Sequence, residues 1–247
     1  MSRCFTIAVT MVLGWSAAAS AQTTTDERWF FSINGAYGVD TQTFDDRATF
    51  VANAEEGRFE TNYTKKSGPM LGVSGGFLLT PRLGVGAAVS QDSRSTPVTL
   101  VASVPHPFYF DRMRPITGDV GGLTRRELGV HLHASAVFPV SPAVTITLSG
   151  GPSYFGVSQD VVTGFAYAEA FPYDEARFER ADTAKNSGSA IGVNAGGDLA
   201  IFLTSRAGIG ISAQFARATV DMPSANGGTT RVRVGGLSTG AGLRLRF

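Results

Sequence analysis

The final stretch of the sequence, residues 232–247, alternates between two kinds of side chain. Odd positions from Leu237 to Phe247 are mainly apolar, and even positions from Gly236 to Arg246 carry glycine, serine or arginine. Successive side chains of a β-strand point to opposite faces, so this pattern predicts one long strand with an apolar and a polar face. We place the apolar face against lipid and the polar face toward a crowded lumen, which is the arrangement of a transmembrane barrel.

Seven earlier segments show the same alternation and predict seven more strands. They span residues 29–39, 71–79, 83–90, 127–138, 144–154, 191–201 and 209–215. Tight turns at Thr80–Arg82, Pro139–Pro142 and Thr204–Arg206 join three pairs of them, and longer polar segments join the others. The sequence therefore predicts an all-β protein, an eight-stranded antiparallel up-and-down transmembrane β-barrel with long extracellular loops and short periplasmic turns.

Aromatic residues near the strand ends fit the two girdles of such a barrel. The expected inner girdle contains Trp29, Phe138 and Phe247, and the expected outer girdle contains Tyr37, Tyr154 and Phe215. These positions predict where the two membrane interfaces lie.

The long connections are not uniformly polar. The segment 91–126 contains the strand-like run Val98–Val104, so a ten-stranded barrel with an extra hairpin in that segment is an alternative. Residues such as Phe108, Phe165 and Tyr173 are too apolar for purely solvated loop tips. We therefore expect the second to sixth strands to continue beyond the membrane and to pack aromatic side chains there.

The first residues have the pattern of a signal peptide. Arg3 precedes a mostly apolar run from Cys4 to Trp15, and the small residues Ala19–Ala21 follow. This order predicts a signal peptide over residues 1–21 and an outer-membrane β-barrel domain over residues 22–247. Cys4 is the single cysteine of the sequence, so the mature chain would contain no disulfide and no cysteine metal site.

Charge and hydropathy narrow the class of protein further. Loss of Arg3 would lower the number of Lys and Arg from 21 to 20, which equals the 20 Asp and Glu. A neutral chain lacks the basic excess of a nucleic-acid binder, so we expect no nucleic acid among its partners. No apolar run of about 18 residues follows the predicted signal peptide, which excludes a helical membrane protein. We expect a monomer in the outer membrane of a Gram-negative-type cell, in contact with outer-membrane lipid and lipopolysaccharide.

These features resemble the small outer-membrane barrels of the OmpA-like and OmpW-like group across about residues 29–247. The resemblance rests on the export signal, the eight alternating segments and the closing run Gly240–Phe247. It implies that Leu243, Leu245 and Phe247 belong to the signal that the barrel-assembly machinery recognises. OmpA carries a peptidoglycan-binding domain after its barrel, whereas this sequence ends with the barrel, so the resemblance implies no wall-anchoring role. It implies no catalytic motif and no cofactor.

Some short patterns resemble catalytic motifs. The runs Gly72–Gly76 and Gly236–Gly240 match Gly-x-Ser-x-Gly, but a nucleophile elbow needs a following helix, so we interpret them as small inward faces of strands. His131, His133 and Ser135 suggest a lipid A-modifying barrel enzyme, whose His-x-Ser pattern they partly match. They lie near the periplasmic turn, and the asparagine of that pattern is missing. We therefore predict no enzyme, and no metal site because a third ligand is not evident.

Six polar residues on three predicted strands share the lumen-facing parity. They are Glu127, His131, His133, Asp198, Arg244 and Arg246. The interior of an eight-stranded barrel is just wide enough for side chains to fill. We therefore predict a polar network that obstructs the lumen, with Arg244 paired to Asp198 or Glu127. In the alternative interpretation, these residues are separate solvated groups at the two mouths.

The sequence leaves the function open between different classes. One hypothesis is a non-enzymatic structural or surface-interaction barrel that acts through its extracellular loops. A second is a narrow porin-like channel or a passage for a small apolar solute, because glycine-rich inner faces leave room in the lumen. A lipid A-modifying barrel enzyme is the third. No ligand motif identifies what the loops bind.

Overall fold

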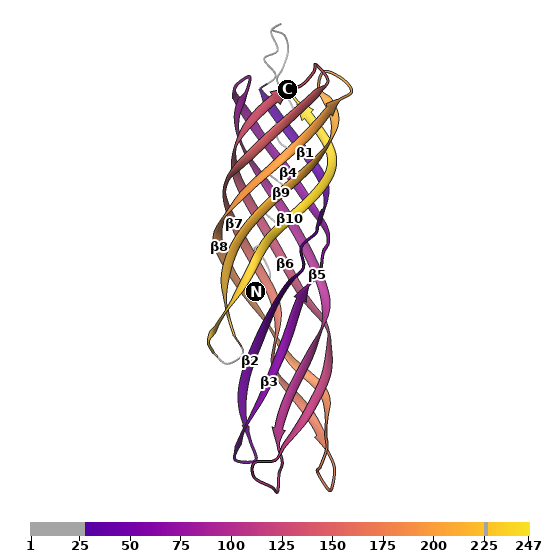
Figure 1. Cartoon of the computed structure of the whole chain (residues 1–247), viewed down its shortest axis with the longest axis vertical. Helices are drawn as coiled ribbons and strands as arrows, with labels where there is room; N and C mark the ends of the chain where they lie inside the picture. The colour runs from indigo at the N-terminus through magenta and orange to yellow at the C-terminus, as the bar shows by residue number, and fades with distance from the viewer. Residues whose placement is uncertain (1–27, 225–226) are drawn as a thin grey trace, which may run out of the picture.

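The computed structural model describes residues 28–224 and 227–247, so the predicted signal peptide lies outside the described residues. Antiparallel strands form one long, twisted sheet that closes on itself (Figure 1). The strands are β1 (Trp29–Gly38), β2 (Gln42–Ala52), β3 (Glu55–Lys65), β4 (Gly68–Thr80), β5 (Leu83–Pro105), β6 (Met113–Pro139), β7 (Val144–Glu169), β8 (Ala176–Phe202), β9 (Ala207–Pro223) and β10 (Thr229–Arg246). Within the described ranges, no helix is long and apolar enough to cross a membrane.

Eight of these strands form the barrel. Their order around the ring is β5-β4-β1-β10-β9-β8-β7-β6, and pairing of β6 with β5 closes the ring. The first strand joins the last one, because β1 pairs with β10 on one side and with β4 on the other. The predicted eight-stranded antiparallel barrel is therefore confirmed, and its tight turns follow β4, β6 and β8 at one end.

The remaining two strands, β2 and β3, form a hairpin between β1 and β4. The hairpin lies beyond the end of β4, where β3 pairs with β5 from Arg58 opposite Ser103 to Asn62 opposite Thr99. The alternative of a ten-stranded barrel with an extra hairpin in residues 91–126 does not hold. Val98–Val104 belongs to β5 itself, which continues past an irregularity between Thr96 and Val98. Such a break in register accommodates Pro97, which has no amide hydrogen to donate to the ladder.

Four strands of the barrel continue far beyond its membrane-sized part. β5, β6, β7 and β8 contain 23, 27, 26 and 27 residues, whereas about 9 to 11 residues suffice to cross a membrane. Together with the β2–β3 hairpin they build a projection that we call the extension (Figure 1). Continuation was expected for the second to sixth strands. It holds for β5 to β8, whereas β4 begins only at Gly68 and does not reach into the extension. Long connections of such barrels lie outside the cell, so we expect the extension to be extracellular.

The chemistry of the two faces is exchanged partway along the strands. In β10, even-numbered residues face inward throughout, but Ser238 is polar whereas Val232 and Val234 are apolar and buried. On the outer face, Leu237 and Leu243 are exposed and apolar, whereas the residues nearer the extension are polar. A barrel segment with an apolar outer face is suited to lipid, whereas a segment with a polar outer face and an apolar interior is suited to water. This exchange therefore marks where the strands leave the membrane.

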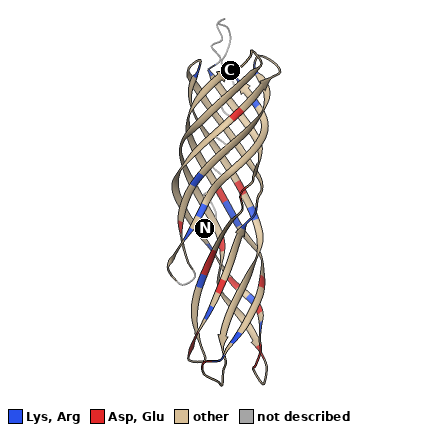
Figure 2. Ribbon diagram, in the orientation of Figure 1, with Lys and Arg blue, Asp and Glu red and all other residues tan. Residues whose placement is uncertain are grey.

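We call this level the outer boundary. The last apolar outward residues before it include Val89, Leu128, Tyr154, Ile191, Phe215 and Leu237. The first polar outward residues beyond it are Gln91, Arg126, Ser158, Ser189, Arg217 and Arg233. Lys, Arg, Asp and Glu are sparse on the barrel near the C-terminus and frequent along the extension (Figure 2). All six aromatic residues expected in the girdles have exposed side chains, as the girdle interpretation requires.

The exchange of faces predicts unequal effects of the same substitution at two sites on β8. Ala195 and Ser187 are both small, exposed and outward-facing, but Ala195 lies in the lipid-facing part and Ser187 beyond the outer boundary. Ala195→Arg should destabilise the inserted barrel by about 2–4 kcal/mol, because it places a cation in hydrocarbon. Ser187→Arg should change stability by less than about 0.5 kcal/mol. Urea unfolding in lipid vesicles measures both, and equal losses would contradict the boundary.

Candidate functional site

A cavity with a mixed polar and apolar wall occupies the periplasmic half of the barrel interior. Its volume is about 340 Å³, and we call it the polar cavity after the six polar residues Ser32, Asn34, Ser74, Ser149, Asn194 and Asp198 in its wall. The cavity exists because the inward positions of the barrel strands carry small side chains. It reaches the periplasmic end, where its lining includes Phe30, Phe202 and Arg246.

Arg244 and Asp198 form an ion pair in the wall of this cavity. The Arg244 Nε lies 3.1 Å from Oδ1 and 3.0 Å from Oδ2 of Asp198, and its Nη1 donates to Asn34 Oδ1 at 2.7 Å. Gly210 makes room for the pair, because a Cβ there would lie 2.8 Å from the Arg244 Nε. The pair links β10 to β8 across β9 and leaves the cavity beside it open, so it does not plug the lumen.

His131 lies deeper in the lumen and bridges two serine hydroxyl groups. Its Nε2 lies 3.0 Å from Ser90 Oγ, and its Nδ1 lies 2.8 Å from Ser153 Oγ. Ser153 Oγ also accepts a hydrogen bond from Asn194 Nδ2 at 2.9 Å. These contacts join β5, β6, β7 and β8 on the inside of the barrel, and both ring nitrogens of the histidine are occupied.

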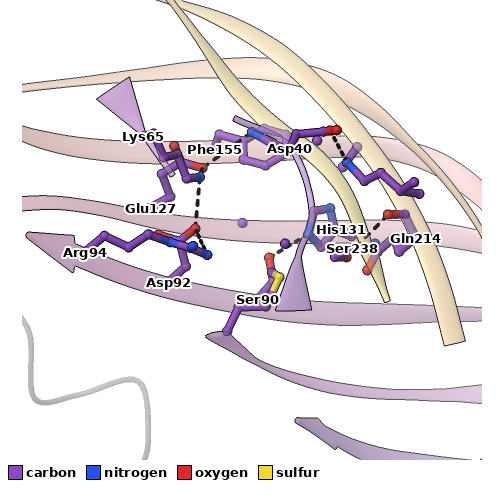
Figure 3. Close-up of a pocket in the computed structure, with 17 residues that line it drawn as sticks. Asp40, Lys65, Ser90, Asp92, Arg94, Glu127, His131, Phe155, Gln214 and Ser238 are labelled. Atoms are coloured by element: carbon purple, nitrogen blue, oxygen red, sulfur yellow. Dashed lines mark hydrogen bonds and ion pairs between the residues drawn. The ribbon is translucent and has the colours of Figure 1, made fainter. Parts of the chain in front are cut away.

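On the side of His131 that faces the extension, five charged side chains cross the lumen and form what we call the charged layer. They are Lys65, Asp92, Arg94, Arg125 and Glu127, each 6% to 9% exposed. The Lys65 Nζ lies 2.9 Å from Asp92 Oδ2 and 2.7 Å from Glu127 Oε2 (Figure 3). The Arg125 Nε donates to Glu127 Oε1 at 2.7 Å. The lysine at the end of the β2–β3 hairpin thus joins carboxylates of β5 and β6.

Backbone groups complete the charged layer. Arg94 donates to the carbonyl groups of Lys66 and Gly68 at 2.8 Å each, and Arg125 donates to the carbonyl of Arg233 at 2.7 Å. A side chain at position 68 would displace the Arg94 guanidinium, because a Cβ there would lie 2.3 Å from Arg94 Nη1. Only about 50 Å³ of space remains between the layer and His131, enough for very few water molecules.

Apolar side chains fill the interior beside and beyond the charged layer. Beside it lies an apolar layer of Phe155, Val157, Val220, Val232 and Val234, in which Val157 is paired directly with Glu127. Farther out is the extension core, which contains Phe59, Tyr63, Leu100, Val104, Ile116 and Val162. The Val162 amide donates to the Tyr63 hydroxyl at 2.7 Å, and burial raises the pKa of Tyr63 to about 12. The interior of the extension is therefore a packed and mainly apolar protein core.

The far end of the extension, which we call the tip, joins three turns: 53–54, 106–112 and 170–175. Arg114 lies behind these turns and is only 2% exposed. Its Nη1 lies 2.7 Å from Glu169 Oε2. The same side chain donates hydrogen bonds to the carbonyl groups of Tyr173 at 3.0 Å and Pro105 at 2.8 Å. The turn 106–112 is held by Glu55 Oε1, which accepts a hydrogen bond from the Asp111 amide at 2.7 Å. These contacts fix the turns against one another.

Aromatic side chains cover this fixed tip without being buried. The exposed ones are Phe108, Tyr109, Phe110 and Phe171, and Phe171 is 85% exposed. Phe108 contacts Tyr173 edge to face with 5.3 Å between ring centroids. Exposed aromatic side chains on a rigid base are typical of surfaces that bind other molecules.

Comparison with solved structures supports the barrel fold through one match. OprG from Pseudomonas aeruginosa matches with a TM-score of 0.50 and 14% identity over 89% of this chain and 96% of that chain. The chain has the fold of a small outer-membrane β-barrel. The protease OmpT from Escherichia coli matches with a TM-score of 0.47 and 10% identity over 92% of this chain and 99% of that chain. Ail of Yersinia pestis matches with a TM-score of 0.38 and 12% identity over 88% of this chain and 99% of that chain. Neither a protein-family model nor a curated protein matches the sequence.

This likeness concerns the fold of the outer-membrane barrel alone. The sequences of these three proteins are at most 14% identical to this chain, and one of them is named as a protease. Barrels of one fold carry unrelated functions, so the function has to be argued from the sites of this chain.

The barrel divides the six residues of the predicted network among different places. It brings Arg244 together with Asp198, whereas Glu127 lies in the charged layer with Lys65 and Arg125. The expected alternative of Glu127 as the partner of Arg244 was wrong. His131 bridges serines between these two pairs, and His133 lines the polar cavity.

Arg246 lies at the periplasmic mouth. Its guanidinium carbon is 4.0 Å from the centroid of the Phe202 ring, and its Nε donates to the Ser205 carbonyl at 2.5 Å. Among the residues of the predicted assembly signal, Leu243 and Phe247 are exposed on the outside and Leu245 is half-buried. The Phe247 amide donates to the Trp29 carbonyl at 2.8 Å, which fastens the end of the chain to β1. The assembly signal itself stays a prediction.

Sequence reasoning missed Lys65, Asp92, Arg94 and Arg125. A signal was present, because Asp92 and Arg94 continue the inward parity of Ser90, and Arg125 that of Glu127. Lys65 gave no such signal, since it reaches the lumen only through the β2–β3 hairpin. Among the described residues, no three His, Cys, Asp or Glu side chains are arranged to hold a metal ion.

The charged layer contains three cations and two carboxylates, which predicts an asymmetric response to neutralisation. Glu127→Gln leaves a buried excess of positive charge and should cost about 3–5 kcal/mol of unfolding free energy. Lys65→Met leaves two arginines with two carboxylates and should cost less. The double variant should lose less than the sum of the single losses. Urea unfolding followed by circular dichroism measures this, and a larger loss for Lys65→Met would contradict the assignment.

Proposed function

We propose that this chain is a non-enzymatic outer-membrane barrel that holds a rigid interaction surface outside the cell. The observation that carries the proposal is the tip, where three turns fixed around buried Arg114 display exposed aromatic side chains. A surface ordered before binding loses little conformational entropy when a partner docks. The extension core supports the same function, because it keeps the tip at a fixed position relative to the membrane.

The layering of the interior argues against an open channel. The polar cavity would hold water or small solutes from the periplasm, but the charged layer and the apolar layer lie between it and the outside. A conducting path would have to break several buried ion pairs and then pass a packed and mainly apolar core. A narrow channel remains the second candidate because of the cavity alone.

The histidines favour a structural role over lipid A chemistry. His131 has a hydroxyl on each ring nitrogen and faces the lumen, and among the described residues no carboxylate completes a catalytic triad around it. Ser135 Oγ is buried without a hydrogen-bond partner among the described residues, so no base activates it. A lipid substrate would be in the membrane, on the opposite side of the barrel wall.

The proposal includes how the protein reaches its site. The predicted signal peptide over residues 1–21 directs export and is removed, and the barrel-assembly machinery inserts the chain as a monomer. The exposed apolar side chains of β10, such as Leu243, are suited to contact lipid during and after insertion.

A photo-reactive amino acid at the tip tests the interaction surface. It replaces Phe110, and intact cells that display the protein are then irradiated. Because Phe110 is exposed on the fixed tip, the photo-reactive group should form adducts of defined mass with the bound partner. The same group in place of Thr183, an exposed residue of β8 away from the tip, is the matched control and should form none. Adding Phe108→Ser and Phe171→Ser should reduce the adducts at position 110 at least tenfold while leaving the barrel folded.

Planar-bilayer recordings on the same protein separate the two candidates. The proposal expects no steady conductance from the wild type. Steady conductance together with no adducts at position 110 would replace the interaction surface by the channel. Equal adducts at positions 110 and 183 would also contradict the assignment to the tip.

A further inference from the structure

Two arginines lie side by side on the outside of the barrel, just beyond the outer boundary. Arg217 on β9 and Arg233 on β10 are exposed and face outward. Arg217 is opposite Gly235, and Arg233 is opposite Thr219, so the two arginines are diagonal neighbours on adjacent antiparallel strands. Such neighbours are about 7–8 Å apart at their backbones, close enough for two long side chains to reach one group between them. Gly235 has no side chain to cover that space.

Neither guanidinium group has a partner among the described residues. Across residues 28–224 and 227–247, the side chains of Arg217 and Arg233 make no hydrogen bond or ion pair. The nearby carboxylates are engaged elsewhere: Asp221 lies 3.7 Å from Arg231, and Asp40 accepts the Leu237 amide at 2.6 Å. Adjacent like charges repel each other, so an anion between them would lower the energy of this surface.

The position in the membrane identifies the kind of anion. Directly on the membrane side of the two arginines, Phe215 and Leu237 are apolar and exposed at 44% and 39%. A ligand with acyl chains below and a phosphate above would match both parts of this surface. Guanidinium groups bind phosphate through paired, charge-assisted hydrogen bonds, and a phosphate monoester carries a charge of about −1.5 to −2 at neutral pH.

We propose that Arg217 and Arg233 form a binding site for a phosphate group of lipid A in the outer leaflet. The two arginines hold the phosphate between β9 and β10, and Phe215 and Leu237 contact the acyl chains beneath it. The site lies outside the lumen and away from the tip, so it stands whether or not the tip binds a partner.

The test uses the full mature chain in nanodiscs and measures the affinity for three probes. These are bis-phosphorylated lipid A, the same lipid without its phosphates, and inorganic phosphate. The wild type should bind phosphorylated lipid A, and Arg217→Gln combined with Arg233→Gln should weaken that binding at least tenfold. Removal of the lipid phosphates should weaken binding to the wild type by a similar factor.

Arg231→Gln is the matched control. Arg231 is an exposed arginine on the same strand as Arg233, but it already has a partner in Asp221. It should change the affinity for lipid A by less than twofold. Arg217→Lys combined with Arg233→Lys keeps the charge but loses the paired geometry, and should give an intermediate affinity. If the glutamine variant fails to assemble, this lysine variant and the dephosphorylated lipid still test the site.

Three results would overturn the proposal. One is equal binding of phosphorylated and dephosphorylated lipid A by the wild type. Another is an Arg231→Gln variant that loses as much affinity as the double glutamine variant. The third is inorganic phosphate that binds as tightly as lipid A and displaces it, which would make the site one for a free anion.

Discussion

In a closed β-sheet each residue faces either the inside or the outside, and this choice alternates along the strand whatever medium surrounds it. The rest of this structure depends on that constraint. In β10 the parity that directs Ser238 into the lumen also directs Val234 into the apolar layer. Because the strands run from lipid into water without a break, the polar and apolar faces have to exchange at the outer boundary. One sheet therefore serves as a membrane barrel and, farther along, as the wall of a water-soluble core.

The charged layer lies where the two interiors meet. On its periplasmic side the lumen is polar and partly open, and on its outer side the core is packed and mainly apolar. Buried charges are costly unless each has partners, and here Lys65 and Arg125 neutralise Glu127 while Lys65 and Arg94 neutralise Asp92. Lys65 is the last residue of β3, so the layer also anchors the hairpin to the barrel. Closure of the lumen and attachment of the extension are thus achieved by the same contacts.

Much of the fold could be predicted because the period-two pattern is a local property of the chain. The eight barrel strands, the tight turns and the outward girdle residues such as Trp29 and Tyr154 follow from that pattern. The β2–β3 hairpin was missed because residues such as Thr43 and Asp45 give it a polar outer face that reads as a loop. The alternative of an extra hairpin in residues 91–126 rested on the strand-like run Val98–Val104, which belongs to β5. Pro97 lies just before that run. Its actual role is to mark an irregularity inside β5.

The candidate sites were less predictable, because they depend on pairings between distant parts of the chain. Parity placed Glu127, Asp198 and Arg244 on the inner face, but parity does not give the height of a residue along a tilted barrel. Only the register of β10 and β8 on either side of β9 brings Arg244 to Asp198. The register of β3 on β5 in turn places Lys65 near Asp92. Arg217 and Arg233 are separated by 16 positions and become neighbours only through the β9–β10 ladder.

Accessibility of single cysteines from each side of the membrane tests the closed interior most directly. Ser212→Cys places a thiol in the polar cavity, and Thr183→Cys places one on the exposed extension, in described residues that contain no other cysteine. Each variant would be reconstituted in sealed vesicles with the extension outward and treated with a small, membrane-impermeant thiol reagent. Position 183 should react at once, and position 212 only after the vesicles are opened. Rapid reaction of position 212 in sealed vesicles would show that the charged and apolar layers do not close the lumen.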